Sequence, residues 1–317
     1  MSHLVFSFST SLTLNYHLHI PLDTLGEQKV IIAEGIDGRG AEMSDLIRID
    51  GTLYTGCDKT GQIYSLDEEG GSVEPVVTLY EGNPDEADES KSRFKIEWIS
   101  EFGDQIYVGS HGRSDEKGRS VMKEVKVLTR SWEWVDSIDL SETYDALAGE
   151  AGTGGKGFLC HEAVTYNPNT SRWYFFPRKL YPDQDFDMDL YQNETGTNLL
   201  LTTDSDFGDI QVHTIGEVDP STGYAAIAFL PEPYQHLAVL VKTRESTDGE
   251  LGTYIVLVDT ESQELLGEEF EVSTDAKYEG IECTGLEDEE GGEDADEGGD
   301  DAEEGGEDAE EGGEDEE

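Results

Sequence analysis

Apolar and polar residues alternate in short runs along most of this chain, and glycine-containing turns separate the runs. Residues 46–56 predict a strand, an Asp-Gly turn and a second strand, and residues 98–110 repeat that design. Comparable apolar runs follow at residues 172–177, 237–241 and 254–258. Alternation with a period of two is typical of half-buried strands. The pattern therefore predicts an all-β protein.

Helical periodicity is confined to residues 141–147, where Ser141 is the candidate N-cap. No apolar run approaches the ~18 residues of a membrane-spanning helix, so no transmembrane segment is expected. The mildly apolar residues 4–14 lack the basic start of a secretory signal and give no clear signal peptide. No feature of the sequence specifies an oligomeric state.

Five short segments recur at nearly even intervals between the predicted strands. Steps from Ser44 to Glu97, Glu162, Ala225 and Glu279 measure 53, 65, 63 and 54 residues. Such an interval fits one four-stranded propeller blade with its loops. One position per blade, each near the axis, would gather three carboxylates and several backbone oxygens around one point. A set of oxygen ligands suits a hard cation such as calcium.

The formal net charge of −53 argues against nucleic acid and anionic membranes as partners, because phosphate groups attract Lys and Arg. Residues 287–317 hold 20 of the 73 acidic residues and no large apolar residue. We expect this tail to be disordered, and it would serve either as a solubilising appendage or as a weak calcium-collecting or partner-binding segment. Residues 1–286 would form the propeller domain.

The three cysteines, Cys57, Cys160 and Cys283, lie far apart in the sequence. Their spacing predicts neither a disulfide framework nor a zinc site, and reduced, partly buried thiols are the expectation. The catalytic and nucleotide-binding patterns HExxH, GxSxG and the P-loop are absent from the sequence.

Eight short strings, in order, resemble those of the calcium-activated nucleotidases, the soluble apyrases of the bed-bug salivary type. They are GRG with MSDL (38–46), DKTG (58–61), EW with YVG (97–109), GFLCHE (157–162), RW with PR (172–178), NLLL (198–201), DFGDI (206–210) and KYEGIE (277–282). The resemblance covers about Val30 to Cys283. It implies a five-bladed β-propeller with calcium in its central cavity. It also implies hydrolysis of nucleoside diphosphates such as UDP and GDP, and more weakly of triphosphates, to release phosphate.

The resemblance also implies which residues bind the metal and the substrate. The calcium ligands carried over are Ser44, Asp45, Glu97, Glu162, Ala225 and Glu279. Asp45 would act through a water molecule, and Ala225, where the family has serine, through its backbone carbonyl. Arg178 resembles the phosphate-binding arginine of the family, and Arg113 stands where the family has lysine. Asp58 resembles an active-site acid that could polarise the attacking water.

Each of these roles has a structural alternative. Arg178 could be a surface cation, Asp58 could simply begin its turn, and His161 is expected to be a structural neighbour of Glu162. The family begins its propeller with a strand that ends in Asp-Leu-Asp and contributes catalytic acids, and here Pro21 would replace the first Asp while Asp23 keeps the second. Alternatively, residues 12–20 form a later strand of that blade and the Asp pair is missing. Either way, the first blade is expected to be incomplete.

The leading prediction is thus a calcium-dependent nucleoside diphosphatase. The alternatives are a calcium-binding propeller that has lost catalysis through its shortened N-terminus, and an acidic interaction scaffold without metal. By resemblance the protein would work in the secretory pathway or outside cells.

Overall fold

The computed structural model describes residues 11–13, 19–21, 42–67, 72–82, 93–113 and 120–283. Contacts divide the chain into the units Met1–Gly285 and Leu286–Glu317. All elements named below belong to the first unit. The predicted acidic tail lies outside the described residues, and its disorder stays a prediction.

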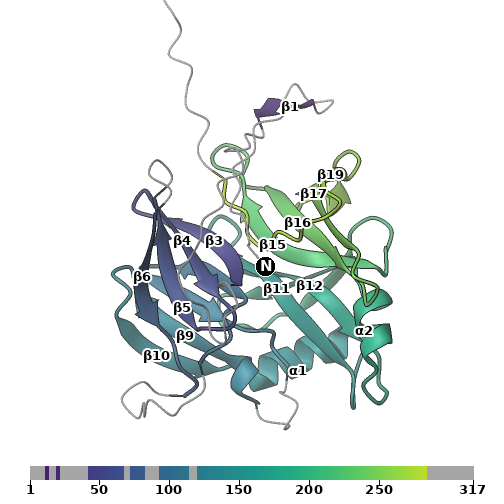
Figure 1. Cartoon of the computed structure of the whole chain (residues 1–317), viewed down its shortest axis with the longest axis horizontal. Coiled ribbons are helices and arrows are strands. Elements are labelled where there is room, and N and C mark those ends of the chain that lie inside the picture. Colours follow the sequence, from purple (N-terminus) through teal and green to yellow (C-terminus); the bar gives the residue numbers. More distant parts are fainter. Residues whose placement is uncertain are drawn as a thin grey trace, which may run out of the picture. The chain divides into compact units, whose positions relative to one another are not determined.

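Four antiparallel sheets follow one another along the chain, each built from consecutive strands (Figure 1). The first contains β3 (Met43–Ile49), β4 (Thr52–Cys57), β5 (Gln62–Leu66) and β6 (Val73–Thr78). The second contains β7 (Trp98–Phe102), β8 (Gln105–Gly109), β9 (Glu124–Thr129) and β10 (Trp134–Asp139). The third contains β11 (Phe158–Asn167), β12 (Arg172–Tyr181), β13 (Leu199–Asp204) and β14 (Gln211–Thr214). The fourth contains β15 (Thr222–Phe229), β16 (Leu237–Glu245), β17 (Leu251–Asp259) and β18 (Glu264–Leu265), and β19 (Phe270–Ser273) also pairs with β17.

The first strand of each sheet faces the first strands of the other sheets. β11 packs against both β7 and β15, and β3 packs against β7. Meandering four-stranded sheets that meet through their innermost strands form a β-propeller. The predicted all-β propeller arrangement is therefore confirmed.

The number of blades differs from the prediction, because the described residues contain four blades and not five. Near the N-terminus, β1 (Ser11–Thr13) pairs with β2 (His19–Pro21), and within the described residues these two strands form a sheet of their own. The fifth of the evenly spaced segments begins no strand, since Glu279 follows β19 in extended chain. Its carbonyl oxygen accepts a hydrogen bond of 2.8 Å from the backbone of Asp45 instead. Even spacing predicted a fifth blade at Glu279, but this residue belongs to a segment that runs back to β3.

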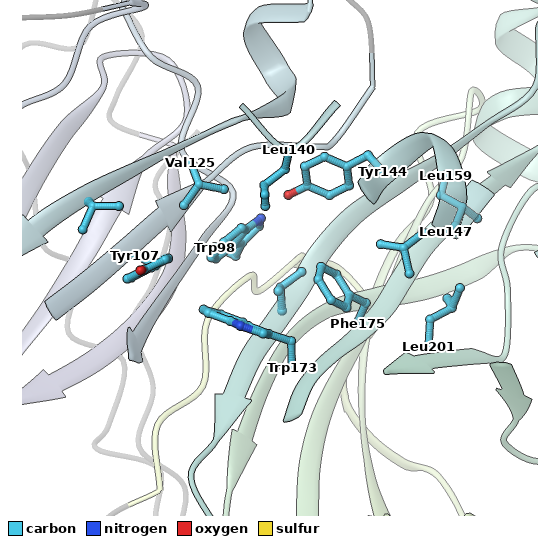
Figure 2. Packing of buried hydrophobic residues seen from close by; sticks show 12 residues of the cluster. Trp98, Tyr107, Val125, Leu140, Tyr144, Leu147, Leu159, Trp173, Phe175 and Leu201 are labelled. Carbon is cyan, nitrogen blue, oxygen red and sulfur yellow. The ribbon is translucent and has the colours of Figure 1, made fainter. Parts of the chain in front are cut away.

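Aromatic side chains fill the interface between the second and third blades (Figure 2). Trp98 of β7 and Trp173 of β12 are fully buried, with ring centroids 6.0 Å apart. Burial of one large apolar side chain contributes about 1.5–3 kcal/mol, so this interface is a major source of stability. Gly109 of β8 lies against Trp98, where an added Cβ would come within 2.0 Å of the indole ring. A residue without a side chain is therefore required there.

The predicted helix is present as α1 (Ser141–Glu150), which buries Tyr144 and Leu147 in the same interface. Its predicted cap is wrong, because Leu140 is the N-cap residue and no side chain caps the helix. Ser141 donates its hydroxyl proton to Asp139 instead.

Two further short helical segments were not predicted. They are α2 (Met188–Asn193) and the 3-10 turn Ser120–Lys123. α2 is too short for a periodicity signal, although its cap is a favourable one, with the Asp187 carboxylate accepting a hydrogen bond from Leu190 N. Among the described residues no helix is long and apolar enough to cross a membrane.

Candidate functional site

Three of the predicted metal residues occupy equivalent positions on the first strands of their sheets. The pairing of β3, β11 and β15 with their neighbours skips Asp45, Glu162 and Ala225, so each is a bulge residue. Glu97 directly precedes β7, and its N–H donates to the carbonyl of Gly109 at 2.9 Å. Bulges turn a side chain out of the alternating pattern and are common beside active sites. The first, third and fourth blades therefore present their predicted residues from one repeated geometry, while the second presents Glu97 from just before its first strand.

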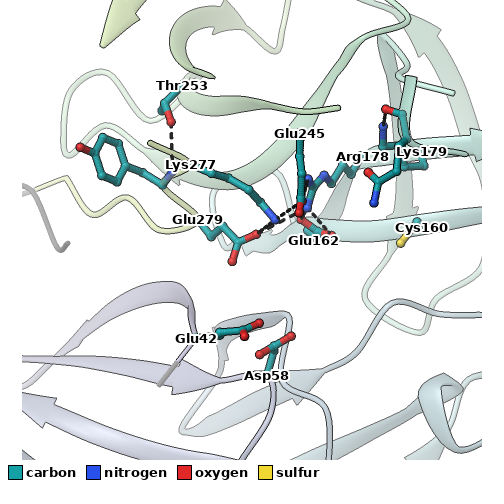
Figure 3. Close-up of polar contacts among 12 residues, drawn as sticks. Glu42, Asp58, Cys160, Glu162, Arg178, Lys179, Glu245, Thr253, Lys277 and Glu279 are labelled. Atoms are coloured by element: carbon teal, nitrogen blue, oxygen red, sulfur yellow. Dashed lines mark hydrogen bonds and ion pairs between the residues drawn. The ribbon is translucent and has the colours of Figure 1, made fainter. Parts of the chain in front are cut away.

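Glu162 and Glu279 meet at Arg178 (Figure 3). The Nη1 atom of Arg178 donates to both carboxylate oxygens of Glu162, at 3.0 and 2.8 Å, and lies 3.5 Å from Oε1 of Glu279. Nη2 of the same guanidinium donates to Glu245 at 3.2 Å. Arg178 is only 6% exposed, so its interpretation as a surface cation is wrong.

Gly223 of β15 helps to position this arginine. A Cβ added to Gly223 would lie 2.0 Å from the carbonyl oxygen of Arg178. Glycine thus lets β15 of the fourth blade approach β12 of the third blade closely at the site.

Glu97 joins this group through His111. Nε2 of His111 lies 2.9 Å from Glu97 and 3.3 Å from Glu162. On its other side Glu97 forms an ion pair with Lys95, whose ammonium group also donates to Oδ2 of Asp58 at 2.9 Å. Asp58, Glu97, Glu162 and Glu279 thus belong to one continuous polar cluster.

Asp45 and Ser44 lie at the same end of β3. The Asp45 carboxylate accepts backbone hydrogen bonds from Leu46 at 2.9 Å and from Ile99 at 2.7 Å, and thereby ties β3 to β7. The Ser44 hydroxyl is buried and has no hydrogen-bond partner among the described residues. An orphaned buried oxygen of this kind fits a role as a metal ligand. Ala225 is buried and offers only backbone atoms, as the sequence requires.

The other predicted catalytic residues, Asp58, Arg113 and Asp23, do not all lie in this cluster. Asp58 accepts hydrogen bonds through Oδ2 alone, while its Oδ1 is buried and unpartnered within the described part of the chain. Asp58 therefore does more than begin its turn. The guanidinium carbon of Arg113 lies 5.2 Å from the ring centroid of Phe158, outside the ion-pair network. Asp23 lies outside the described residues.

His161 is structural, as the sequence suggested. Its ring is fully buried and packs 5.2 Å from Tyr144 and 5.4 Å from Phe175. Burial lowers the pKa of His161 to about 3, so the ring stays neutral. Its backbone N–H donates to the carbonyl of His111 at 2.9 Å and fixes that residue beside β11.

Comparison with known proteins identifies the family of the chain. The family profile described as apyrase matches residues 12–284. The chain belongs to the apyrase family. It is 34% identical over 250 residues to soluble calcium-activated nucleotidase 1 of Mus musculus, an alignment that covers 77% of this chain and 59% of that relative. The chain therefore spans less than two thirds of the length of this relative.

Two insect apyrases are similar over a larger share of their own length. The apyrase of Phlebotomus duboscqi is 32% identical, with 77% of this chain and 71% of the relative covered. The apyrase of Cimex lectularius is 29% identical, with 82% and 70% covered. The resemblance found in the eight strings is thus confirmed.

Three cations of this cluster were not predicted as site residues from the sequence: Lys95, His111 and Lys277. Lys277 forms ion pairs with Glu279 and with Glu245, the latter at 2.8 Å. Lys95 and Lys277 each stand two residues before a predicted glutamate, and alternate residues of an extended chain point to the same side. This shared Lys-x-Glu pattern was a usable signal. His111 had none beyond its proximity to Arg113.

Neighbouring cations keep the carboxylates of Glu97 and Glu162 ionised. Burial alone would raise the pKa of Glu97, but His111 and Lys95 outweigh it and lower that pKa to about 2. Burial is likewise outweighed at Glu162, whose pKa falls well below its usual range beside Arg178. Both groups are therefore anionic at neutral pH. Anionic oxygens from two blades fit the ligand preference of calcium.

Proposed function

We propose that the protein hydrolyses nucleoside diphosphates, and more weakly triphosphates, to release phosphate in a calcium-dependent reaction. The observation that carries this proposal is the buried Arg178, which contacts Glu162 and Glu279 in one cluster. Such a cluster holds anionic oxygens for a divalent cation directly beside a guanidinium for phosphate. A diphosphate would otherwise be repelled by a protein with a net charge of −53.

The ligand set in this proposal comprises Ser44, Asp45, Glu97, Glu162, Ala225 and Glu279. The three glutamates would bind calcium through carboxylates and Ala225 through its carbonyl. Asp45 would bind through water, because its two oxygens already accept backbone hydrogen bonds. When bound, calcium supplies positive charge to the phosphate oxygens and orients them.

The side chains of the protein supply the remaining steps. Arg178 would donate hydrogen bonds to the terminal phosphate and stabilise the charge that develops during attack by water. The unpartnered Oδ1 of Asp58 would accept a proton from that water, with Lys95 holding the other carboxylate oxygen. Arg113 would contact phosphate from beside Phe158, and Asp23 would complete the acid set.

The test is phosphate release from UDP and GDP with calcium and then with a chelator. Release that stops on chelation and returns with added calcium would support the proposal. Calcium-bound, folded protein that releases no phosphate from any nucleoside diphosphate would refute it and match the alternative of a calcium-binding propeller without catalysis. We further propose that the protein acts in the calcium-rich secretory pathway or outside cells, since the mouse relative is named as calcium-activated.

A further inference from the structure

We propose that His111, Cys160 and Glu162 form a second metal site, which takes a borderline cation such as zinc rather than calcium. One ligand atom of each residue lies within 4.8 Å of those of the other two. All three side chains are buried, with Cys160 fully inaccessible. The sequence spacing predicted no zinc site because His111 and Cys160 come from different blades and only the fold brings them together.

The donor set distinguishes this site from the calcium cluster. It offers an imidazole nitrogen, a thiol sulfur and a carboxylate oxygen, which is a combination that zinc accepts in a tetrahedral shell. Calcium takes oxygen ligands and gains little from sulfur or nitrogen. A thiolate and a carboxylate together balance the charge of a divalent cation, and three protein ligands leave one position open.

The surroundings hold the three ligands in place. The backbone bond of 2.9 Å from His161 to the carbonyl of His111 fixes the imidazole beside β11. The Tyr191 hydroxyl donates to the Cys160 sulfur at 3.5 Å, and Arg178 holds the carboxylate of Glu162. Nδ1 of His111 is buried and has no hydrogen-bond partner among the described residues, so one ring nitrogen is unused. Outer contacts of this kind orient metal ligands and tune their affinity.

Glu162 belongs to both sites, and this has a functional consequence that rests on the proposed function. A zinc ion held by Cys160 and His111 would draw Glu162 away from the calcium ligands. Zinc should therefore weaken calcium binding, and calcium should weaken zinc binding by the same factor, as linkage requires.

The test uses cobalt as a spectroscopic substitute for zinc, because a cobalt–thiolate bond gives a charge-transfer absorption that oxygen ligands do not. Wild-type protein should show this absorption, and added zinc should remove it. Cys57→Ser is the matched control, since Cys57 is also a free and fully buried thiol, on β4. Cys160→Ser should lose the absorption, while Cys57→Ser should keep it. Zinc affinity should fall in Cys160→Ser by more than the roughly 10–100-fold that loss of an outer-shell contact costs.

A second measurement needs no variant. Zinc should slow alkylation of Cys160 in the wild-type protein and leave alkylation of Cys57 unchanged, as followed by peptide mapping. Absence of the cobalt–thiolate absorption in wild type, its survival in Cys160→Ser, or equal alkylation of Cys160 with and without zinc would overturn the proposal. These readouts do not depend on hydrolysis, so a protein without phosphatase activity would refute the proposed function and leave the zinc site standing.

Discussion

Glu162 and Arg178 are the two residues that the pairing of β11 with β12 leaves out, and they form an ion pair with each other. Cys160 pairs with Lys179, His161 with Pro177 and Ala163 with Phe176, so the register skips one residue on each strand. The carboxylate and the guanidinium are 2.8 Å apart and both are buried. A double irregularity in one hairpin thus aims an anion and a cation at the same point, where a regular ladder would not.

Arg178→Ala should lower the turnover of UDP by roughly 10²-fold or more, because a charge partner of the transition state is lost. Calcium-induced stabilisation should persist, since arginine is not a ligand and its removal frees the carboxylates. Arg172→Ala is the control, because Arg172 begins the same strand but binds Asp209. Equal losses in both variants would show that the effect comes from the strand and not from the site. The measurements are steady-state kinetics and melting temperature with and without calcium.

Glu97→Gln and Glu162→Gln should abolish most of the rise in melting temperature that calcium causes in the wild type. A ligand that binds only the folded protein stabilises it more strongly the more tightly it binds, and each change removes one anionic ligand. Glu101→Gln serves as the control, because Glu101 lies on β7 but forms an ion pair with Arg130 away from the cluster. A calcium shift of equal size in all three variants would place the metal elsewhere.

Substitutions at Asp45 and Ser44 should distinguish a residue that stabilises the fold from one that binds the metal. Asp45→Ala leaves the buried N–H groups of Leu46 and Ile99 unpaired, which should cost about 1–3 kcal/mol each even without calcium. Ser44→Ala removes a hydroxyl without a partner among the described residues and should leave the calcium-free stability nearly unchanged. Its calcium-induced shift should nevertheless shrink. Chemical denaturation with and without calcium measures both, and a large calcium-free loss in Ser44→Ala would contradict this division.

The sequence predicted those parts of the structure that depend on local patterns. Alternation predicted the strands, and the nearly even spacing of Glu97, Glu162 and their counterparts predicted a succession of blades. The blade count failed because it depends on which distant segments pair, and Glu279 pairs its backbone with Asp45 rather than starting a sheet. The sequence did not predict that His111 bridges two carboxylates for the same reason, since its partners Glu97 and Glu162 come from two blades. Position along the chain does not reveal such contacts.

The Glu282 carboxylate ties the C-terminal segment to β3, because its Oε2 accepts a hydrogen bond of 3.1 Å from the backbone N–H of Arg48. Burial raises the pKa of this carboxyl group to about 7, although the charge of Arg48 opposes the rise. The folded protein therefore holds the proton more tightly than the unfolded chain, where the pKa is about 4.3. Between these two values stability should fall as the pH rises, because the folded state must keep a proton that the unfolded state has lost.

Glu282→Gln keeps an oxygen that can accept the bond from Arg48 but cannot ionise, so it should remove this pH dependence. The free energy of unfolding of the variant should increase relative to that of the wild type from pH 5 to pH 7 and remain level above pH 8. Taking the difference between the two proteins cancels the titration of all other groups that the substitution leaves unchanged. Glu264→Gln, at an exposed glutamate of β18, controls for the loss of one negative charge. Parallel stability curves for wild type and Glu282→Gln would show that this carboxyl group titrates alike in the folded and unfolded chain.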